Sequence, residues 1–281
     1  MSVLPYINVE GKTFAEAYHK LLLAVYEEGI TSEKESYAFQ TEKDVLFREC
    51  ESRFEVLDFL EEPMFSRAMP GLPDFPQYIE DILLGTKDYL VAKGIYTYTY
   101  HERIFVPEIE GGQLAEAIRK LGKHPYSNRV QVVIWRVPKD NLMESGQPCL
   151  QRIWFKIFKD EKENNVLRLH VYFRSRDLGY AFNENVVGMK GVAKLVMDCL
   201  NDHYGLNIER INYVDHCDSL HIYGKDAKEF ERTVNLLRKR KEEELFLEST
   251  DPFLQRLWKG RNLFDAVEKV KEEIFDPIFK K

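Results

Sequence analysis

The segment from Ile153 to Phe173, IWFKIFKDEKENNVLRLHVYF, decides the fold class of this chain. Its two ends are rich in β-branched and aromatic residues, which predicts strands over Ile153–Phe158 and Val166–Phe173. The polar run Lys159–Asn165 between them predicts the turn of a hairpin. Apolar residues recur at every second position of the second strand, so we expect one shared, buried face made by Leu167, Leu169, Val171 and Phe173.

Outward from this hairpin, strand patterns and helix patterns follow one another. The other strands expected are Val130–Trp135, buried on both faces, Ile208–Val214 and Leu220–Tyr223. The helices expected are Thr13–Glu28, Tyr78–Leu84, Gln113–Leu121, Glu184–Leu200, Asp226–Phe246 and Asn262–Ile274. Residues 33–61 fit strands or short helical pieces, and residues 96–100 fit a strand or an ordered loop. No repeat or linker interrupts the pattern, so residues 1–281 are predicted to form one α+β domain.

Two helices carry their own boundary signals. Thr13 and Glu16 form a T-x-x-E capping box, and Gly29 stands where a C-terminal cap belongs. Gly122 is expected to end the helix that begins at Gln113.

Composition limits the classes of function. Hydrophobic residues make up 44% and charged residues 31%, a balance typical of globular proteins. The formal net charge of -7 argues against broad nucleic-acid binding, which requires a basic surface. No apolar stretch reaches the ~18 residues of a membrane span, and Met1–Lys12 lacks the pattern of a secretory signal. Four well-separated cysteines without a CxxC pair favour a reducing cytoplasm.

Four short motifs carry polar chemistry between or beside these strands. Taken alone, Cys149 has the pattern of a small buried hydrophobe, as most lone cysteines do. The arginines of Arg174–Asp177 could lower the pKa of a thiol or hold a phosphate. Asn183 offers a donor and an acceptor to a pyrimidine edge, and His221 and Tyr223 share one face of a strand.

Together these motifs resemble the thymidylate synthase family in order and approximate spacing. The resemblance runs from about Gln113 to Tyr223 through the motifs Ser127-Asn128-Arg129-Val130, Pro148-Cys149, Arg174-Ser175-Arg176-Asp177, Phe182-Asn183 and His221-Ile222-Tyr223. It implies an α+β fold with a large, bent mixed sheet flanked by helices. It also implies a homodimer that forms through the sheet face and shares its active sites.

The resemblance implies a thymidylate synthase-type methyltransferase that works by covalent catalysis. Cys149 would add to carbon 6 of a pyrimidine 5′-monophosphate, which turns carbon 5 into a nucleophile. Carbon 5 would then attack the one-carbon unit of the cosubstrate, 5,10-methylenetetrahydrofolate. Asn183 favours uracil, so the reaction implied is dUMP to dTMP.

The roles of the remaining site residues also follow from the resemblance. Arg174 and Ser175 would hold the nucleotide phosphate, and Arg129 would reach the phosphate bound by the neighbouring subunit. Asp177 would bind the pterin ring of the folate. Asn183 would bind the base, and His221 and Tyr223 the sugar 3′-hydroxyl. Glu80 is the candidate for the carboxylate that organises proton transfer, although an exposed helix carboxylate fits its pattern equally well.

The sequence departs from the family at the phosphate site. Asn128 replaces the first arginine of the usual pair, and the family's early arginine-bearing loop has no clear match near Thr31–Thr41. The candidates for the missing positive charge are Arg67 and Arg103. Tyr98, Tyr100 and Glu102 lie where the family has an active-site wall, and their roles stay open.

These departures leave two alternatives to thymidylate synthesis. The first is a hydroxymethylase acting on dUMP, dCMP or CMP, in which water adds to the same intermediate. The second is a non-catalytic nucleotide-binding protein on the same fold. His216-Cys217-Asp218 offers no ligand set with a recognised spacing, so we expect no metal.

Overall fold

A computed structural model describes residues 4–33 and 45–280. Its strands are β1 (Tyr6–Gly11), β2 (Ile30–Glu33), β3 (Val45–Val56), β4 (Phe65–Ser66), β5 (Gln131–Val133), β6 (Leu150–Lys159), β7 (Asn165–Phe173), β8 (Arg176–Asp177), β9 (Ile208–Tyr223) and β10 (Phe246–Leu247). Its helices are α1 (Phe14–Glu28), α2 (Phe75–Leu84), α3 (Asp88–Ala92), α4 (Tyr100–Ile104), α5 (Gly112–Lys123), α6 (Val137–Asp140), α7 (Ala181–Tyr204), α8 (Ala227–Lys239), α9 (Glu242–Leu245), α10 (Pro252–Leu257), α11 (Asp265–Val270) and α12 (Asp276–Phe279).

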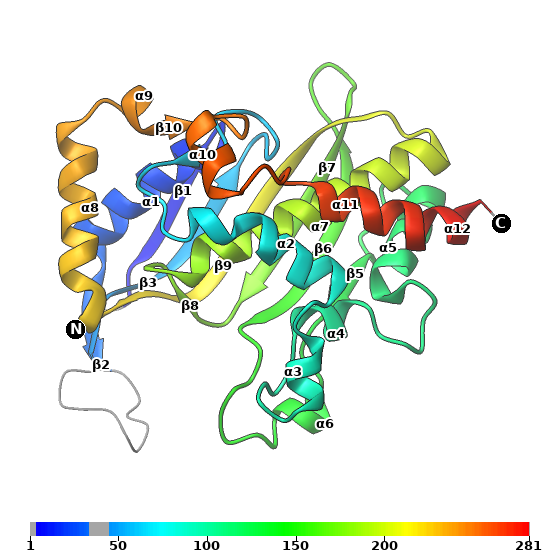
Figure 1. Ribbon diagram of the computed structural model, residues 1–281, viewed down its shortest axis with the longest axis horizontal. Coiled ribbons are helices and arrows are strands. Elements are labelled where there is room, and N and C mark those ends of the chain that lie inside the picture. The colour runs from blue at the N-terminus through cyan, green and yellow to red at the C-terminus, as the bar shows by residue number, and fades with distance from the viewer. Residues whose placement is uncertain (1–3, 34–44, 281) are drawn as a thin grey trace.

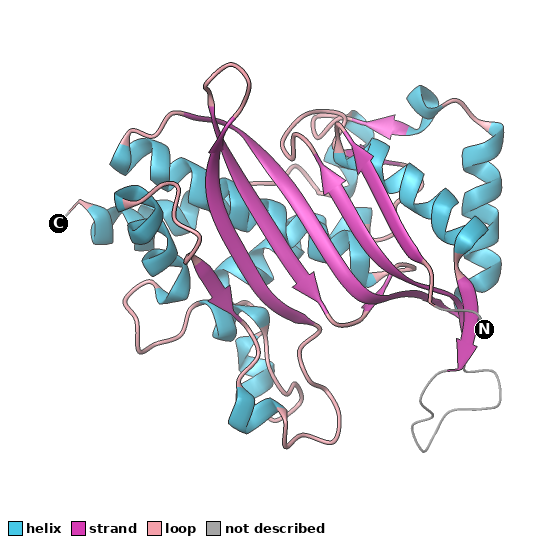
Figure 2. Ribbon diagram, turned by 180° about the vertical axis from the view of Figure 1, so that it is seen from behind, coloured by secondary structure: helices cyan, strands magenta, loops and turns pink. Residues whose placement is uncertain are grey.

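Eight strands form one mixed sheet in the order β1-β3-β9-β7-β6-β5, with β2 on β3 and β8 on β9. The pairs β1–β3, β7–β9 and β8–β9 are parallel, and the other pairs in this sheet are antiparallel. Helices cover one face of the sheet, as Figures 1 and 2 show from opposite sides. The architecture confirms the predicted α+β fold with a large mixed sheet flanked by helices.

The decisive hairpin forms as predicted. Strands β6 and β7 pair in antiparallel register from Leu150 opposite Phe173 to Lys159 opposite Asn165. The four apolar residues that share one face of β7 are all fully buried: Leu167, Leu169, Val171 and Phe173. They pack beneath the helical layer.

The first helix also has the predicted boundaries. The Thr13 hydroxyl accepts a hydrogen bond from the backbone N–H of Glu16, and Gly29 caps the other end by donating to the Val25 carbonyl. Gly29 has extended backbone there rather than a left-handed turn, because the chain continues directly into β2. Helix α2 ends at Gly85, which does adopt the left-handed conformation.

Several predicted boundaries differ from those in the structure. The two strands expected within 208–223 are one strand, β9, and β3 runs unbroken to Val56. The helix expected over Asp226–Phe246 ends at Lys239, because Arg240 and Lys241 have extended backbone and the chain then enters α9 and β10. The helix expected over Asn262–Ile274 begins at Asp265 and changes at Lys271 into a π-helical turn. Helix α5 continues one residue past Gly122.

The prediction that 130–135 is a strand buried on both faces was also wrong. Only Gln131–Val133 form β5, and Val132 is buried while Val133 is 42% exposed. The strand lies at the edge of the sheet, where one of its faces has no helical cover within residues 4–33 and 45–280. None of the helices described is long and apolar enough to cross a membrane.

Helix α7 crosses the centre of the helical layer and buries one lysine. Lys190 is fully buried, and its ammonium nitrogen lies 4.2 Å from the centre of the Phe59 ring. It donates a hydrogen bond to the Phe59 carbonyl. Burial lowers the pKa of Lys190 to about 7, because a charged ammonium loses its hydration there.

The depressed pKa of Lys190 predicts a pH-dependent stability. The unfolded state binds a proton at Lys190 between about pH 7 and pH 10.5 that the folded state does not, so stability rises with pH in that window. Replacing Lys190 with Met removes this rise. From pH 7.5 to pH 9.5, we expect the free energy of unfolding of the unsubstituted protein to rise by about 2 kcal/mol relative to that of Lys190→Met.

Urea unfolding at the two pH values measures this shift. Lys194→Met is the control, since Lys194 lies on the same helix but is partly exposed and paired with Asp198. An equal shift in both variants would contradict the assignment to Lys190.

Candidate active site

The predicted nucleophile lies at the end of the sheet where β6 begins. Cys149 directly precedes β6, and its carbonyl accepts a hydrogen bond from the backbone N–H of Arg174 (3.0 Å) just after β7. The Arg174 guanidinium donates to the carbonyls of Pro148 (3.1 Å) and Gln147 (3.0 Å). Arg174 therefore holds the loop that carries Cys149 while its own side chain stays largely exposed.

Strand pairing carries this group of residues across the sheet. In the short strand β8, Arg176 pairs with Leu220 and Asp177 pairs with His221 of β9. The backbone N–H of Leu178 donates to the His221 carbonyl (2.8 Å). Cys149, Arg174–Asp177 and His221–Tyr223 thus form one continuous strip at the same end of β6, β7, β8 and β9.

A buried cation lies beneath this strip. Arg176 is 2% exposed and is sandwiched between the rings of Phe173 and Phe182, 4.0 and 4.2 Å from their centres. Its Nη1 donates to Asp215 (2.6 Å), which also accepts from the Tyr213 hydroxyl (2.6 Å). The ion pair with Asp215 offsets part of the free-energy cost of burying the guanidinium next to the predicted nucleophile.

The environment of the Cys149 thiol combines burial with positive charge. Burial raises the pKa of Cys149, and the charges of Arg174 and Arg176 oppose that rise. The Tyr100 hydroxyl accepts a hydrogen bond from the backbone N–H of Leu150 (3.3 Å), and the Tyr98 hydroxyl interacts with the Cys149 backbone. Two tyrosines therefore form a wall beside the thiol.

This wall lines a cavity of about 580 Å³. Titratable residues contribute most of its polar groups: Tyr78, Asp81, Lys87, Tyr96, Tyr98, Tyr100 and Glu184. Burial raises the pKa of Tyr78, whose hydroxyl accepts a hydrogen bond from the Asn185 amide (2.5 Å). The cavity thus brings α2, α4 and the first turn of α7 together beside the loop of Cys149.

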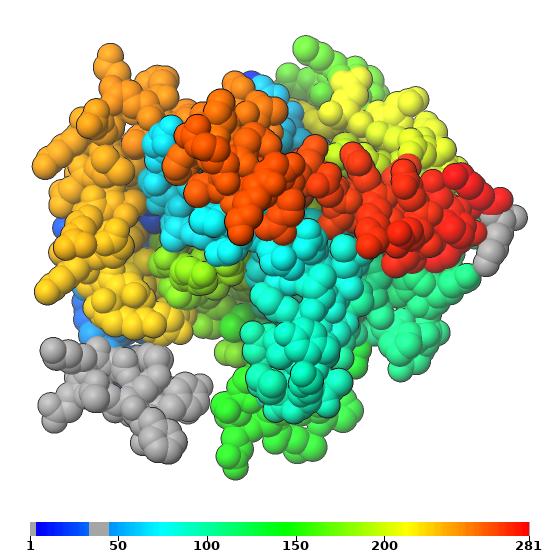
Figure 3. Space-filling model, in the orientation of Figure 1, coloured from blue at the N-terminus to red at the C-terminus, as the bar shows by residue number. Residues whose placement is uncertain are grey.

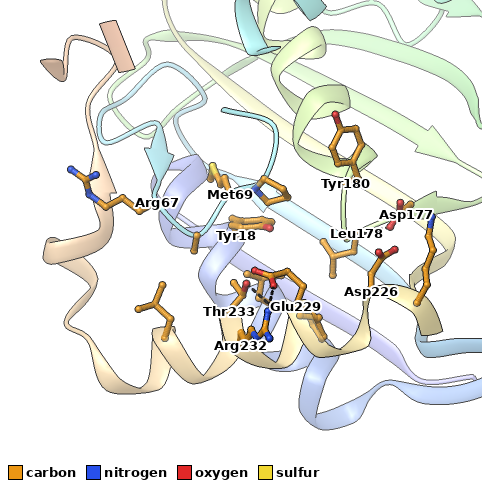
Figure 4. Close-up of a pocket in the computed structure, with 17 residues that line it drawn as sticks. Tyr18, Arg67, Met69, Asp177, Leu178, Tyr180, Asp226, Glu229, Arg232 and Thr233 are labelled. Carbon is orange, nitrogen blue, oxygen red and sulfur yellow. Dashed lines mark hydrogen bonds and ion pairs between the residues drawn. The ribbon is translucent and has the colours of Figure 1, made fainter. Parts of the chain in front are cut away.

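A second cavity, of about 640 Å³, lies beside Asp177. The space-filling view shows the surface hollowed between α8 and the segment that leads into α2 (Figure 3). Asp177 and Asp226 lie on one side of this cavity, Arg67 lies on the opposite side, and Tyr18 lies between them (Figure 4). Burial raises the pKa of Asp177, while the backbone N–H of Gly179 donates to its carboxylate (2.8 Å) and opposes that rise.

Asn183 lies in the first turn of α7. Its side chain is fully buried, and its Nδ2 donates to the Tyr18 hydroxyl (3.2 Å). Its Oδ1 has no hydrogen-bond partner among the residues described. A buried amide oxygen without a partner is costly, so this atom is suited to accept a hydrogen bond from a ligand.

His221 and Tyr223 lie side by side near the end of β9, as the alternation of the strand predicts. Their rings meet edge to face, 4.8 Å between centres. His221 is 4% exposed, and Glu49 of β3 lies opposite it in the sheet. Ser219 contacts both His221 and Glu49. Its hydroxyl donates to Glu49 (2.6 Å), and its carbonyl lies 3.1 Å from Nδ1 of His221.

Arg129 and Arg103, two further candidates, lie apart from this group. Arg129 precedes β5 at the far end of the sheet, beside Asn128, which accepts from Lys156 (2.7 Å). Lys156 is seven residues along the strand from Cys149, a separation of about 20 Å. Arg103 is buried in a bidentate pair with Asp140, so it cannot supply the missing phosphate charge; of the two candidates, only Arg67 lines a cavity.

Glu80 lies on the side of α2 that faces the C-terminal helices. Its carboxylate is 3.5 Å from the Arg261 guanidinium. Tyr78 and Asp81 line the cavity, whereas Glu80 is two residues after Tyr78 and so about 200° around the helix from it. The structure therefore does not bring Glu80 to the cavity beside Cys149.

Sequence reasoning missed Tyr78 and Glu184. In the sequence, Tyr78 has the pattern of an ordinary residue of an amphipathic helix. Only the packing of α2 against α7 shows that it lines a cavity. Glu184 had a usable signal, because it is a carboxylate directly after the amide predicted to bind the base.

Comparisons with known proteins define the family. Residues 93–255 match the thymidylate synthase family, which covers more than half of the chain, so the chain belongs to that family. Two proteins described as "Putative thymidylate synthase" are similar. That of Methanothermobacter thermautotrophicus is 30% identical over 158 residues, or 56% of this chain and 63% of the relative. That of Methanosarcina barkeri is 31% identical over 139 residues, or 50% of this chain and 58% of the relative.

The matched segments span less than two thirds of either relative. Among solved structures, the thermostable thymidylate synthase A of Bacillus subtilis has the same fold. Its TM-score is 0.55 with 14% identity, over 79% of this chain and 84% of that chain.

The site geometry predicts selective alkylation of Cys149. Cys149 is partly exposed, whereas Cys50, Cys199 and Cys217 are buried. We expect iodoacetamide to modify Cys149 first in the native protein, with a pH midpoint above the ordinary thiol value because burial raises its pKa. Replacing Arg174 with Gln should move this midpoint further upward, because a nearby positive charge is lost.

Peptide mass analysis over a pH series measures both effects. Arg152→Gln, on the uncovered face of β6, is the matched control. Modification of a buried cysteine at the same rate as Cys149 would contradict the assignment.

Proposed function

We propose that the protein transfers a one-carbon unit from 5,10-methylenetetrahydrofolate to C5 of a pyrimidine 5′-monophosphate, converting dUMP to dTMP. Cys149 is the nucleophile that adds to C6 of the base. The observation that carries the proposal is the strip in which strand pairing joins Cys149, Arg174–Asp177 and His221–Tyr223 beside the buried amide of Asn183. Membership of the thymidylate synthase family supports the same chemistry.

Different site residues bind the phosphate, the base and the sugar of the nucleotide. Arg174 and Ser175 bind the phosphate, with the largely exposed guanidinium of Arg174 as the main charge. Asn183 binds the uracil edge through its unpartnered Oδ1. His221 and Tyr223 bind the 3′-hydroxyl of the sugar from the end of β9.

The cavity beside Asp177 suits the reduced folate. Asp177, which lines this cavity, accepts a hydrogen bond from the pterin ring. Arg67 lies across the same cavity and attracts an anionic group there, either a carboxylate of the folate or the nucleotide phosphate. The folate is a cosubstrate in this scheme, and no metal takes part.

A homodimer would complete the site. Arg129 lies about 20 Å along the sheet from Cys149, too far to act on the same site within one chain. The uncovered face of the sheet carries half-buried aromatic residues, among them Trp154 and Tyr172, and Tyr172 stacks on His216 with 6.2 Å between ring centres. We propose that a second copy packs on this face and contributes its own Arg129 to the phosphate site.

Hydroxymethylation is the second candidate function. It requires water at the methylene intermediate, whereas methyl transfer requires its exclusion. The hydroxyls of Tyr96, Tyr98 and Tyr100 at the cavity beside Cys149 favour a site that holds water. The same nucleophile and the same cosubstrate serve both reactions.

Product analysis tests the proposed reaction. We expect the protein with dUMP and methylenetetrahydrofolate to yield a nucleotide heavier by one CH₂ group, together with dihydrofolate. Replacing Cys149 with Ala should reduce turnover below detection and leave dUMP binding nearly intact, because the thiol forms the covalent bond.

Mass spectrometry of the nucleotide and absorbance of dihydrofolate are the two measurements, with dCMP, UMP and CMP run in parallel. A hydroxymethyl product without dihydrofolate would select the second function. Full activity of Cys149→Ala, or no product from any nucleotide, would reject the mechanism.

Mixing two inactive variants tests the shared site. We expect Arg129→Ala and Cys149→Ala each to lose activity alone. An equal mixture, refolded or exchanged to form mixed dimers, should recover about a quarter of the full activity, because half of the dimers are mixed and each has one intact site. A mixture of Arg129→Ala with Arg174→Ala tests the same geometry, and no recovery in either mixture would contradict a site that both subunits share.

A further inference from the structure

The proposed reaction needs a base that the assignments above do not supply. Replacing hydrogen by carbon at C5 of the base releases the C5 hydrogen as a proton. The acceptor must lie in the cavity beside Cys149 and must be unprotonated at neutral pH.

The tyrosines do not meet this requirement. Burial raises the pKa values of Tyr78, Tyr98 and Tyr100, so each keeps its proton at neutral pH. They can donate hydrogen bonds to a bound base, but they cannot accept its proton. Among the residues that the structure describes, the carboxylates lining the cavity are Asp81 and Glu184.

Asp81 is already engaged in the structure. Its carboxylate pairs with the Lys87 ammonium (2.5 Å) and accepts hydrogen bonds from Gln77 (3.2 Å) and Thr86. A carboxylate already held by a cation and two donors is not free to contact a bound substrate, because those contacts would have to break first.

Glu184 is the other carboxylate, and its side chain is not engaged in this way. It lies in the first turn of α7, directly after Asn183, and is half-buried. Within the described part of the chain, its carboxylate has neither a hydrogen bond nor an ion pair. The turn at Gly71 borders it, since a Cβ at Gly71 would lie 3.5 Å from Cγ of Glu184.

Glu184 lines one cavity and lies near residues of the other. It lines the cavity beside Cys149. Its charge is the main cause that raises the pKa of Tyr180, which lines the cavity beside Asp177. The charged groups around it are Asp74 from the turn before α2, Asp81 from α2 and Lys87 from the loop after α2. Burial and Asp74 raise the pKa of Glu184, which makes it a stronger base than an exposed glutamate.

We propose, on the basis of the function proposed above, that Glu184 is the catalytic base that takes the proton from C5. The C5–H bond breaks and its hydrogen passes to the Glu184 carboxylate. The electron pair of that bond forms the exocyclic C5=CH₂ double bond. The bond from this carbon to the folate nitrogen breaks, and the nitrogen keeps the electron pair and takes a proton from water to give tetrahydrofolate. Glu80, on the opposite side of α2, has no part in this step.

Replacing Glu184 with Gln keeps the size of the side chain and removes the base. We expect kcat to fall about 100-fold or more, as for the loss of a general base. Release of tritium from dUMP labelled at C5 should fall equally, and dUMP binding should stay nearly unchanged. Glu184→Asp should retain part of the activity and an acidic limb in its pH profile, which Glu184→Gln should lack.

A 5-fluoro-dUMP adduct separates this proposal from the proposed function. Fluorine at C5 cannot leave as a cation, so the reaction stops with Cys149 bound to C6. Glu184→Gln should form this adduct, detected by protein mass, because addition of the thiol precedes the proton transfer. Loss of the adduct in Glu184→Gln would overturn the role of Glu184, and no adduct in the unsubstituted protein would overturn both proposals.

Matched variants complete the test. Asp198→Asn, on the same helix and paired with Lys194, is the control and should keep full activity. A loss of tritium release in Glu80→Gln or Asp81→Asn, with activity kept in Glu184→Gln, would assign the proton transfer to that other carboxylate and overturn the proposal.

Discussion

The parallel pairing of β7 and β8 with β9 is the constraint on which the rest of the site depends. It sets Asp177 beside His221, while the antiparallel pairing of β6 with β7 sets Cys149 beside Arg174. Side chains alternate along a strand, so a slip of one residue in β8 would turn Asp177 into the core and the Arg176 guanidinium out of it. The register of two residues thus determines which charges face a ligand.

Arg176 connects this register to the chemistry of the thiol. Its guanidinium is buried between two phenylalanine rings and is paired with Asp215. Removal of one partner from such a pair would leave a buried charge without compensation. The core therefore holds a fixed positive charge under the strip, which opposes the effect of burial on Cys149. Arg176 therefore links the packing of the core to the reactivity of the Cys149 thiol.

The first turn of α7 carries two polar residues with different surroundings. Asn183 points to Tyr18 and is fully buried, whereas Glu184, one residue later, lines the cavity beside Cys149. Consecutive helical residues point about 100° apart, which is why neighbours in sequence serve different parts of the site. The uncovered face of the sheet lies on the opposite side of the molecule from these helices (Figure 2). In the proposed dimer, the second copy would meet that face and leave the helical layer free.

The amino-acid pattern by itself determined the α+β class, the β6–β7 hairpin, the caps of α1 and the motifs of the thymidylate synthase family. These are local properties, since strand alternation, capping and motif spacing depend on residues close in sequence. Only the tertiary structure decided that β9 is one strand, that Arg103 is buried against Asp140, and that Glu80 faces away from the cavity while Glu184 lines it. Each of these depends on contacts between segments far apart in the chain, and periodicity cannot reveal what a helix face meets.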